Sequence, residues 1–293
     1  MHIPVYCLDK NYYPHQTIRE TYHQVALLEL HKQLLLKIKP DLVHVTHLIN
    51  HTASLLDATK ELGIPAIATL TDFFGICFNN RLEAANGSLC DGPNADRTNC
   101  LTCYLKARID SDQAGVTASL FGRSPSSFPA LAQALKFASR LPGLRHGSLA
   151  SLVADIAERP DILVKQYATY QATIAPTCFL RHAYMANGLS TPMHVMHFGV
   201  DVPRTPKAAT RVGAPVRFGY VGQIAPHKGT DILVDAFSRL PSGCAELHIY
   251  GSEDQDPEYV TALRNKAKRV PIFFTEPSLR RSWQTCFADL TCS

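Results

Sequence analysis

The sequence lacks several features that would assign it to a class at once. It has no run of about 18 apolar residues, so we expect no membrane-spanning helix. The first residues, Met1 to Pro4, lack the charged and apolar regions of a secretion signal. Only 18% of the 293 residues are charged, the net charge is +4, and no dense basic stripe occurs. Nucleic-acid binding is therefore not expected.

Hydrophobic segments of strand length alternate with helical patterns along most of the chain. The expected strands cover residues 41–46, 64–70, 171–177, 194–197, 216–221, 245–250 and 270–274. The expected helices cover residues 17–39, 52–62, 178–188, 230–240 and 257–269. This order predicts an α/β fold with parallel strands, whose ligands bind beyond the carboxyl ends of the strands. A stretch rich in Pro, Ala and Thr predicts a boundary between a domain at 1–203 and a second at 204–293.

Residues 104–170 interrupt this alternation. Gly, Ser and Pro recur there between two helical stretches, 130–139 and 148–158. We interpret the segment as a helical insert that covers one side of the first domain. It is also mildly basic and contains aromatic residues, so it could receive a lipid-linked or polymeric acceptor.

The loop after the strand at 216–221 suits a diphosphate. Gly222 allows a sharp turn and offers its amide to the diphosphate, Lys228 supplies a mobile positive charge, and Gln223 offers a neutral hydrogen bond. Beyond Gly229, the start of the next helix offers unpaired N–H groups and the positive end of its dipole. Together these features predict a phosphate cradle. Ordinary packing of a strand against a helix explains the same pattern equally well.

Four of the nine cysteines, Cys77, Cys90, Cys100 and Cys103, fall within one Gly- and Asn-rich loop at 77–103. The last two have zinc-knuckle spacing, and the other two complete a tetrahedral set. A loop without a hydrophobic core would gain order from a structural zinc ion. The alternatives are reduced thiols at the surface, or a disulfide under oxidising conditions. No adjacent His or carboxylate completes an open catalytic site.

Five segments, taken in order, resemble the retaining glycosyltransferases of the GT-B type, in particular family four. They are residues 39–47, 63–74, 174–180, 198–201 and 217–237. The resemblance implies two Rossmann-like domains, with the acceptor held mainly by the first and the nucleotide-sugar donor by the second. It implies sugar transfer with retention to a polysaccharide or lipid-linked acceptor, without a metal for the chemistry. We therefore expect a cytoplasmic protein with peripheral contact to the inner face of the membrane.

The chain departs from the family pattern at individual residues. Gln223 stands where an arginine is usual, and Thr71 stands where a histidine commonly precedes Asp72. A threonine hydroxyl can hydrogen-bond a sugar but cannot act as a base at neutral pH. His47 ends the neighbouring strand and is a candidate to serve the acceptor, although a histidine there is more often structural. Asp72 is expected to orient its loop rather than attack the sugar.

The family's Gly-rich acceptor loop and its paired-glutamate donor segment have no counterpart in the sequence. The chain therefore resembles a family member truncated at both ends, and two further hypotheses stay open. One is a remnant that folds partly and binds nucleotide or zinc without turnover. The other is an interaction module formed by the cysteine cluster on a Rossmann-like domain.

Overall fold

The computed structural model describes residues 3–111, 127–199, 213–268 and 270–275. The chain divides into two compact units, Met1–Gly199 and Val200–Ser293, each of which we describe by itself. The predicted domain boundary at residue 203 lies outside the described residues. None of the described helices is long and apolar enough to cross a membrane.

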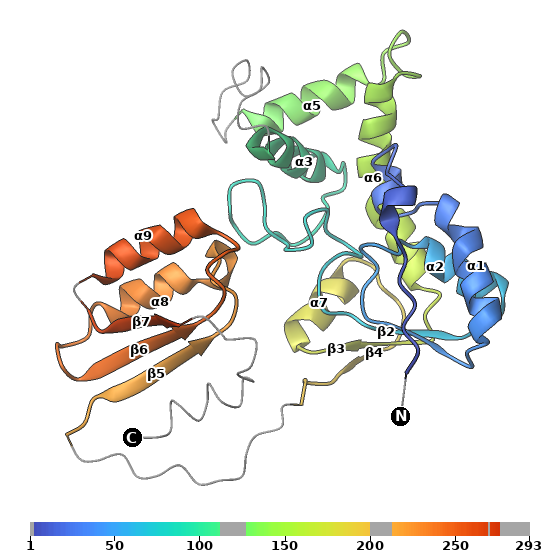
Figure 1. Cartoon of the computed structure of the whole chain (residues 1–293). Coiled ribbons are helices and arrows are strands. Elements are labelled where there is room, and N and C mark those ends of the chain that lie inside the picture. The colour runs from blue at the N-terminus through green and yellow to red at the C-terminus, as the bar shows by residue number, and fades with distance from the viewer. Residues whose placement is uncertain (1–2, 112–126, 200–212, 269, 276–293) are drawn as a thin grey trace. The chain divides into compact units, whose positions relative to one another are not determined.

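The first unit contains a four-stranded parallel sheet in the order β1-β2-β3-β4 (Figure 1). Its strands are β1 (Val43–Val45), β2 (Ala66–Thr69), β3 (Ala172–Ala175) and β4 (Met193–Val195). The helices α1 (Ala26–Ile38), α2 (Ser54–Glu61) and α7 (Cys178–Ala186) flank it. The predicted α/β class with parallel strands is confirmed. The strand order does not reverse within these four strands, so they contain no switch point of the kind that often marks a ligand crevice.

The prediction of one helix over residues 17–39 is wrong in its first half. A short 3-10 turn at Arg19–Thr21 is separated from α1, which begins only at Ala26. The carbonyl of Tyr22 accepts the N–H of Ala53 at 2.8 Å. The carbonyl of Tyr22 is therefore bonded to the start of α2 and not to a following turn of the same helix.

In the part that the structure describes, the insert contains α3 (Thr98–Ser111), α5 (Phe128–Ala138) and α6 (Ser148–Tyr167). They share a small core of Leu101, Tyr104, Ala132, Val153 and Ile156. The helical interpretation of this segment is confirmed within the described residues. Two details were wrong: α3 begins inside the predicted cysteine loop, and α6 runs nine residues past its predicted end at 158.

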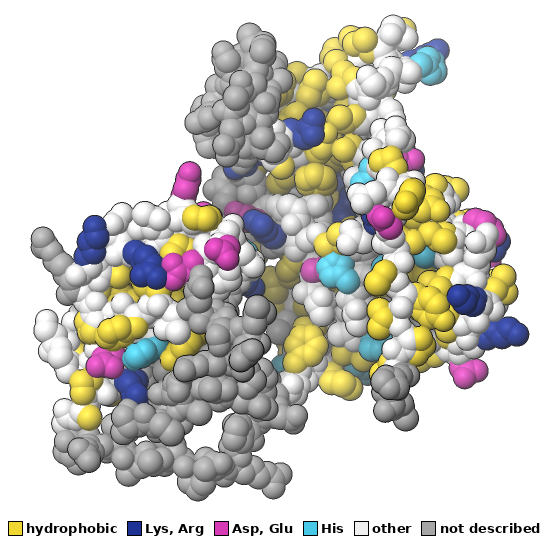
Figure 2. All heavy atoms as spheres, viewed as in Figure 1, with side chains coloured by type: hydrophobic (Ala, Val, Ile, Leu, Met, Phe, Trp, Pro, Cys, Tyr) yellow, Lys and Arg dark blue, Asp and Glu magenta, His cyan; other side chains and the backbone are white. Residues whose placement is uncertain are grey.

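Helix α6 continues through Pro160 because its second half is buried. Residues at four-residue intervals share one face of a helix. On α6 this face carries Asp155, Arg159, Leu163 and Tyr167, each at most 5% exposed. Burial of Leu163 and Tyr167 in the sheet's core outweighs the hydrogen bond that Pro160 removes. Figure 2 shows hydrophobic side chains on the surface in the region of α5. Phe137 of this helix is 68% exposed.

The second unit contains a three-stranded parallel sheet in the order β5-β6-β7. Its elements are β5 (Val216–Val221), a 3-10 turn η3 (Pro226–Lys228), α8 (Thr230–Phe237), β6 (Ala245–Tyr250), α9 (Pro257–Ala267) and β7 (Ile272–Thr275). Its core is formed by Ile224, Val234, Phe237, Ala245, Leu247, Ile249, Val260 and Leu263. The fold of this unit, like that of the first, is compatible with a Rossmann-like domain.

A buried histidine on α1 predicts a pH-dependent stability. His31 is 2% exposed, its Nε2 lies 3.4 Å from Nδ1 of His51, and its Nδ1 has no partner among the described residues. Burial, with smaller effects from His51 and Lys10, lowers the pKa of His31 from 6.5 to about 4. The unfolded chain therefore binds more protons between these values. Stability should fall as the pH drops from 6.5 towards 4, by up to about 1.4 kcal/mol per pH unit.

Urea denaturation at several pH values measures this slope. We expect a His31→Leu variant to flatten it, while His146→Leu, at an exposed position, should leave it unchanged. A His31→Leu variant with the parent's slope would contradict the assignment.

Candidate functional site

The three predicted residues of the first unit lie together at the carboxyl edge of its sheet. His47 follows β1, and Thr71 and Asp72 follow β2. All three line a small cavity with Tyr167 and Tyr170. Its volume of about 10 Å³ is at most that of one water molecule. The cavity is therefore a polar junction between strand ends, and a sugar would bind outside it.

His47 and Asp72 form the most closely bound pair at this edge. Nε2 of His47 lies 2.6 Å from Oδ2 of Asp72, and Nδ1 of His47 accepts the N–H of Ile49 at 3.0 Å. Because Nδ1 accepts a hydrogen bond, the arrangement fits a neutral imidazole whose Nε2–H donates to Asp72. Oδ1 of Asp72 accepts the N–H of Phe74 at 2.7 Å. Asp72 thus orients both its own loop and the histidine.

Buried tyrosines complete the junction, and sequence reasoning missed them. The hydroxyl of Tyr184 donates to the carbonyl of Asp72 at 3.0 Å and accepts the N–H of Gly75 at 3.1 Å. Tyr167 stacks on Tyr184, and the buried Tyr170 hydroxyl has no partner among the described residues. Burial raises the pKa of all three phenols. Buried tyrosine is common in ordinary cores, so the sequence carried no signal for this role.

The four cysteines of the predicted zinc site also lie together. Cys77, Cys90, Cys100 and Cys103 line one cavity of about 20 Å³, and all four are free thiols. Burial raises the pKa of Cys100 to about 12 and also raises that of Cys103. Among the described residues, no three or more His, Cys, Asp or Glu side chains are arranged to hold a metal ion as they stand.

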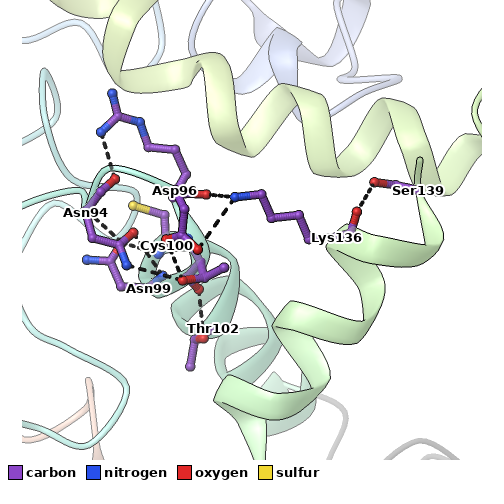
Figure 3. A network of polar contacts seen from close by, with 9 residues as sticks. Asn94, Asp96, Asn99, Cys100, Thr102, Lys136 and Ser139 are labelled. Atoms are coloured by element: carbon purple, nitrogen blue, oxygen red, sulfur yellow. Dashed lines mark hydrogen bonds and ion pairs between the residues drawn. The ribbon is translucent and has the colours of Figure 1, made fainter.

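Cys100 and Cys103 lie on α3 rather than in a loop, and this corrects the expectation that the segment has no core. The two positions are three residues apart and so share a helix face. A polar network fixes the start of this helix (Figure 3). The carboxylate of Asp96 accepts both the hydroxyl and the N–H of Thr98, at 2.8 and 3.2 Å. It also pairs with Lys136 of α5 at 3.7 Å.

A buried arginine of α6 is influenced electrostatically by both the cysteine cluster and the tyrosines. Nη2 of Arg159 donates to the carbonyl of Phe74 at 2.6 Å, and the guanidinium lies 4.9 Å from the ring of Phe74. Nη1 has no partner among the described residues. Burial lowers the pKa of Arg159. The groups that oppose this shift are Tyr167, Cys77, Cys100 and Tyr184.

The predicted donor loop lies at the carboxyl edge of the sheet in the second unit. Lys228 is exposed at the end of η3 and forms no ion pair with the described residues. Gly229 follows with a φ of 69°, in the left-handed region that glycine tolerates. The side chain of Gln223 donates to that of Gln255. The loop thus presents the cation of Lys228 beside a strand end.

Two backbone details differ from the predicted cradle. The N–H of Gly222 donates to the carbonyl of Tyr250 at 3.0 Å, so it extends the ladder between β5 and β6 and is not free for a phosphate. The N–H of Asp231 donates to the hydroxyl of Tyr259 at 3.0 Å, and that hydroxyl donates to the Asp231 carboxylate at 2.9 Å. This hydrogen bond from Tyr259 is the main cause of a lowered pKa of Asp231. One of the backbone N–H groups at the start of α8 therefore already has a hydrogen-bond partner within the chain.

Comparisons with known proteins add no assignment: no family model matches the chain, and no curated protein matches it.

Proposed function

We propose that the chain is a glycosyltransferase of the GT-B type. It would move a sugar, with retention, from a nucleotide diphosphate donor to a polysaccharide or lipid-linked acceptor. The observation that carries the proposal is Lys228, which is exposed at the carboxyl edge of a parallel sheet and forms no ion pair with any described residue. The likeness of five segments to the retaining family four supports it.

On the donor side, Lys228 would neutralise the charge that develops on the leaving diphosphate. This is the main electrostatic task in such a transfer. Gly222 would serve only by its lack of a side chain, since its N–H is used in the sheet. Gln223 would add a neutral hydrogen bond in place of the arginine of the family.

On the acceptor side, the strand ends of the first unit would bind sugar hydroxyls. Thr71 is exposed, and a hydroxyl both donates and accepts hydrogen bonds. His47 is 42% exposed and held by Asp72, so its orientation is fixed before any acceptor arrives. The exposed apolar surface of α5 would suit the lipid part of a lipid-linked acceptor.

The test is a Lys228→Ala substitution. Loss of one charge-assisted hydrogen bond costs about 1.5–3 kcal/mol, so affinity for the donor should fall about tenfold or more. Isothermal titration with UDP, GDP and ADP, and with their glucose conjugates, measures the change. Lys268→Ala is the matched control, because Lys268 is exposed at the far end of α9. Equal affinities in the Lys228→Ala variant and the parent would remove the donor assignment.

The second candidate function is binding of nucleotide without turnover. It is favoured by the Asp231 carboxylate in the first turn of α8, whose negative charge would oppose the further charge that develops on the leaving diphosphate during transfer. Donor binding without sugar transfer and without donor hydrolysis would identify this case.

A further inference from the structure

We propose that Cys77, Cys90, Cys100 and Cys103 bind one thiophilic divalent metal ion, zinc by preference, and that the buried guanidinium of Arg159 balances the charge of this site. The inference is independent of glycosyl transfer and concerns the first unit alone.

The first argument is convergence. The four thiols come from the segment after β2, the middle of the following loop, and the first turns of α3, yet they line one cavity. A cavity of about 20 Å³ holds one water-sized sphere, which suits a single ion. Each sulfur position depends on one side-chain torsion, so thiols around a common space reach tetrahedral geometry by rotamer changes. The rest of the lining comes from the apolar Ile76, Phe78 and Pro93 and from Glu83, Gly92 and Asn99.

The second argument is the set of donors around the sulfur atoms. The N–H of Gly92 donates to Sγ of Cys90 at 3.4 Å, and Nδ2 of Asn99 lies 3.8 Å from the same sulfur. Such donors stabilise a thiolate and orient a metal ligand. Gly92 has a φ of 119°, and a Cβ there would meet the side chain of Asn187, so glycine is required at this position.

The third argument is charge. A buried guanidinium without a partner anion is costly, and Arg159 forms no ion pair with the described residues. The nearest acidic residue on its helix face, Asp155, is bound instead to Arg19 at 3.0 Å. Binding of one divalent ion replaces four S–H protons and leaves the site with a net charge of −2. Cys77 and Cys100 lie within electrostatic range of Arg159, so the metal-bound thiolates would supply the missing anion.

The experiment uses the full chain, purified, reduced and freed of metal. We expect it to take up one Co²⁺ per chain, with the thiolate-to-cobalt absorption and the intense visible bands of a tetrahedral four-sulfur site, and Zn²⁺ to displace the Co²⁺. A Cys100→Ser, Cys103→Ser double variant should lose these bands. Cys244→Ser, an exposed free thiol of the second unit, is the control and should keep them. Arg159→Gln, which retains a donor for the Phe74 carbonyl, should weaken Co²⁺ affinity about tenfold.

Several outcomes would overturn the proposal. A reduced parent protein that binds no Co²⁺, or binds it with the weak bands of oxygen and nitrogen ligands, would exclude the four-thiolate site whether or not the double variant folds. Unchanged Co²⁺ binding by the double variant would exclude it as well. Unchanged affinity in Arg159→Gln would remove Arg159 from the proposal.

Discussion

An Arg159→Ala variant should lose about 3 kcal/mol of unfolding free energy, as measured by urea denaturation followed by circular dichroism. The substitution removes the hydrogen bond to the carbonyl of Phe74 and leaves that buried acceptor unpaired. It also removes the cation–π contacts with Phe74 and Tyr22, at 4.9 and 5.7 Å. A cavity opens where the arginine side chain was buried. All of these losses occur in the same buried volume, so they are measured together as one effect.

Two variants separate these causes. Arg159→Met keeps most of the side-chain volume but not the hydrogen bond, so it should cost less than alanine. Arg140→Ala, at an exposed position, should change stability by less than about 0.5 kcal/mol. An Arg159→Ala chain as stable as the parent would show that the guanidinium contributes nothing net to the core.

The second large effect is expected at Gly251, which follows β6. A Cβ added there would lie 2.3 Å from the carbonyl oxygen of Gly222 and 2.7 Å from Cγ1 of Ile224. Backbone cannot move aside as a flexible side chain can, so the donor loop itself must shift. We expect Gly251→Ala to destabilise the second unit by about 2 kcal/mol. Amide hydrogen exchange of the loop after β5, together with urea denaturation, measures both the shift and its cost.

Gly143→Ala is the matched control for this experiment. A Cβ at Gly143 meets no atom within 4 Å, and its φ lies outside the left-handed region, so the variant should be as stable as the parent. If Gly251→Ala were equally harmless, the close approach of Gly222 to Gly251 would be looser in solution than in the structure.

The strands of the second unit were the easiest part of the fold to predict. The predicted limits at 216–221 and 245–250 coincide with β5 and β6, because a glycine follows each run at its carboxyl end. Helix limits were harder. Residue 98 was assigned to the Gly- and Asn-rich loop at 77–103, whereas α3 begins there and the N–H of Thr98 donates to the carboxylate of Asp96. The helix predicted to end at 158 continues through Pro160 because its second half is buried.

In the candidate site, too, some residues could be predicted from the sequence and others could not. Spacing along the chain pointed to the four cysteines and to Lys228, because their chemistry is visible in the residue type alone. The residues that hydrogen-bond and pack around the site are distant in sequence, and no local sequence pattern identifies them. Arg159 lies 85 positions from the Phe74 carbonyl that it binds, and Tyr184 lies 112 positions from Asp72.

The buried face of helix α6 limits which mutations the chain can accept during evolution. Its buried face links four structures in turn: the Asp155 pair with Arg19, the Arg159 contacts, the core at Leu163, and the strand-end junction at Tyr167. Inserting or deleting one residue turns everything beyond that point by about 100°. Point substitutions on the exposed face of α6 should therefore be tolerated, whereas a change in its length would break the Arg159 contacts and the packing of Tyr167 at once.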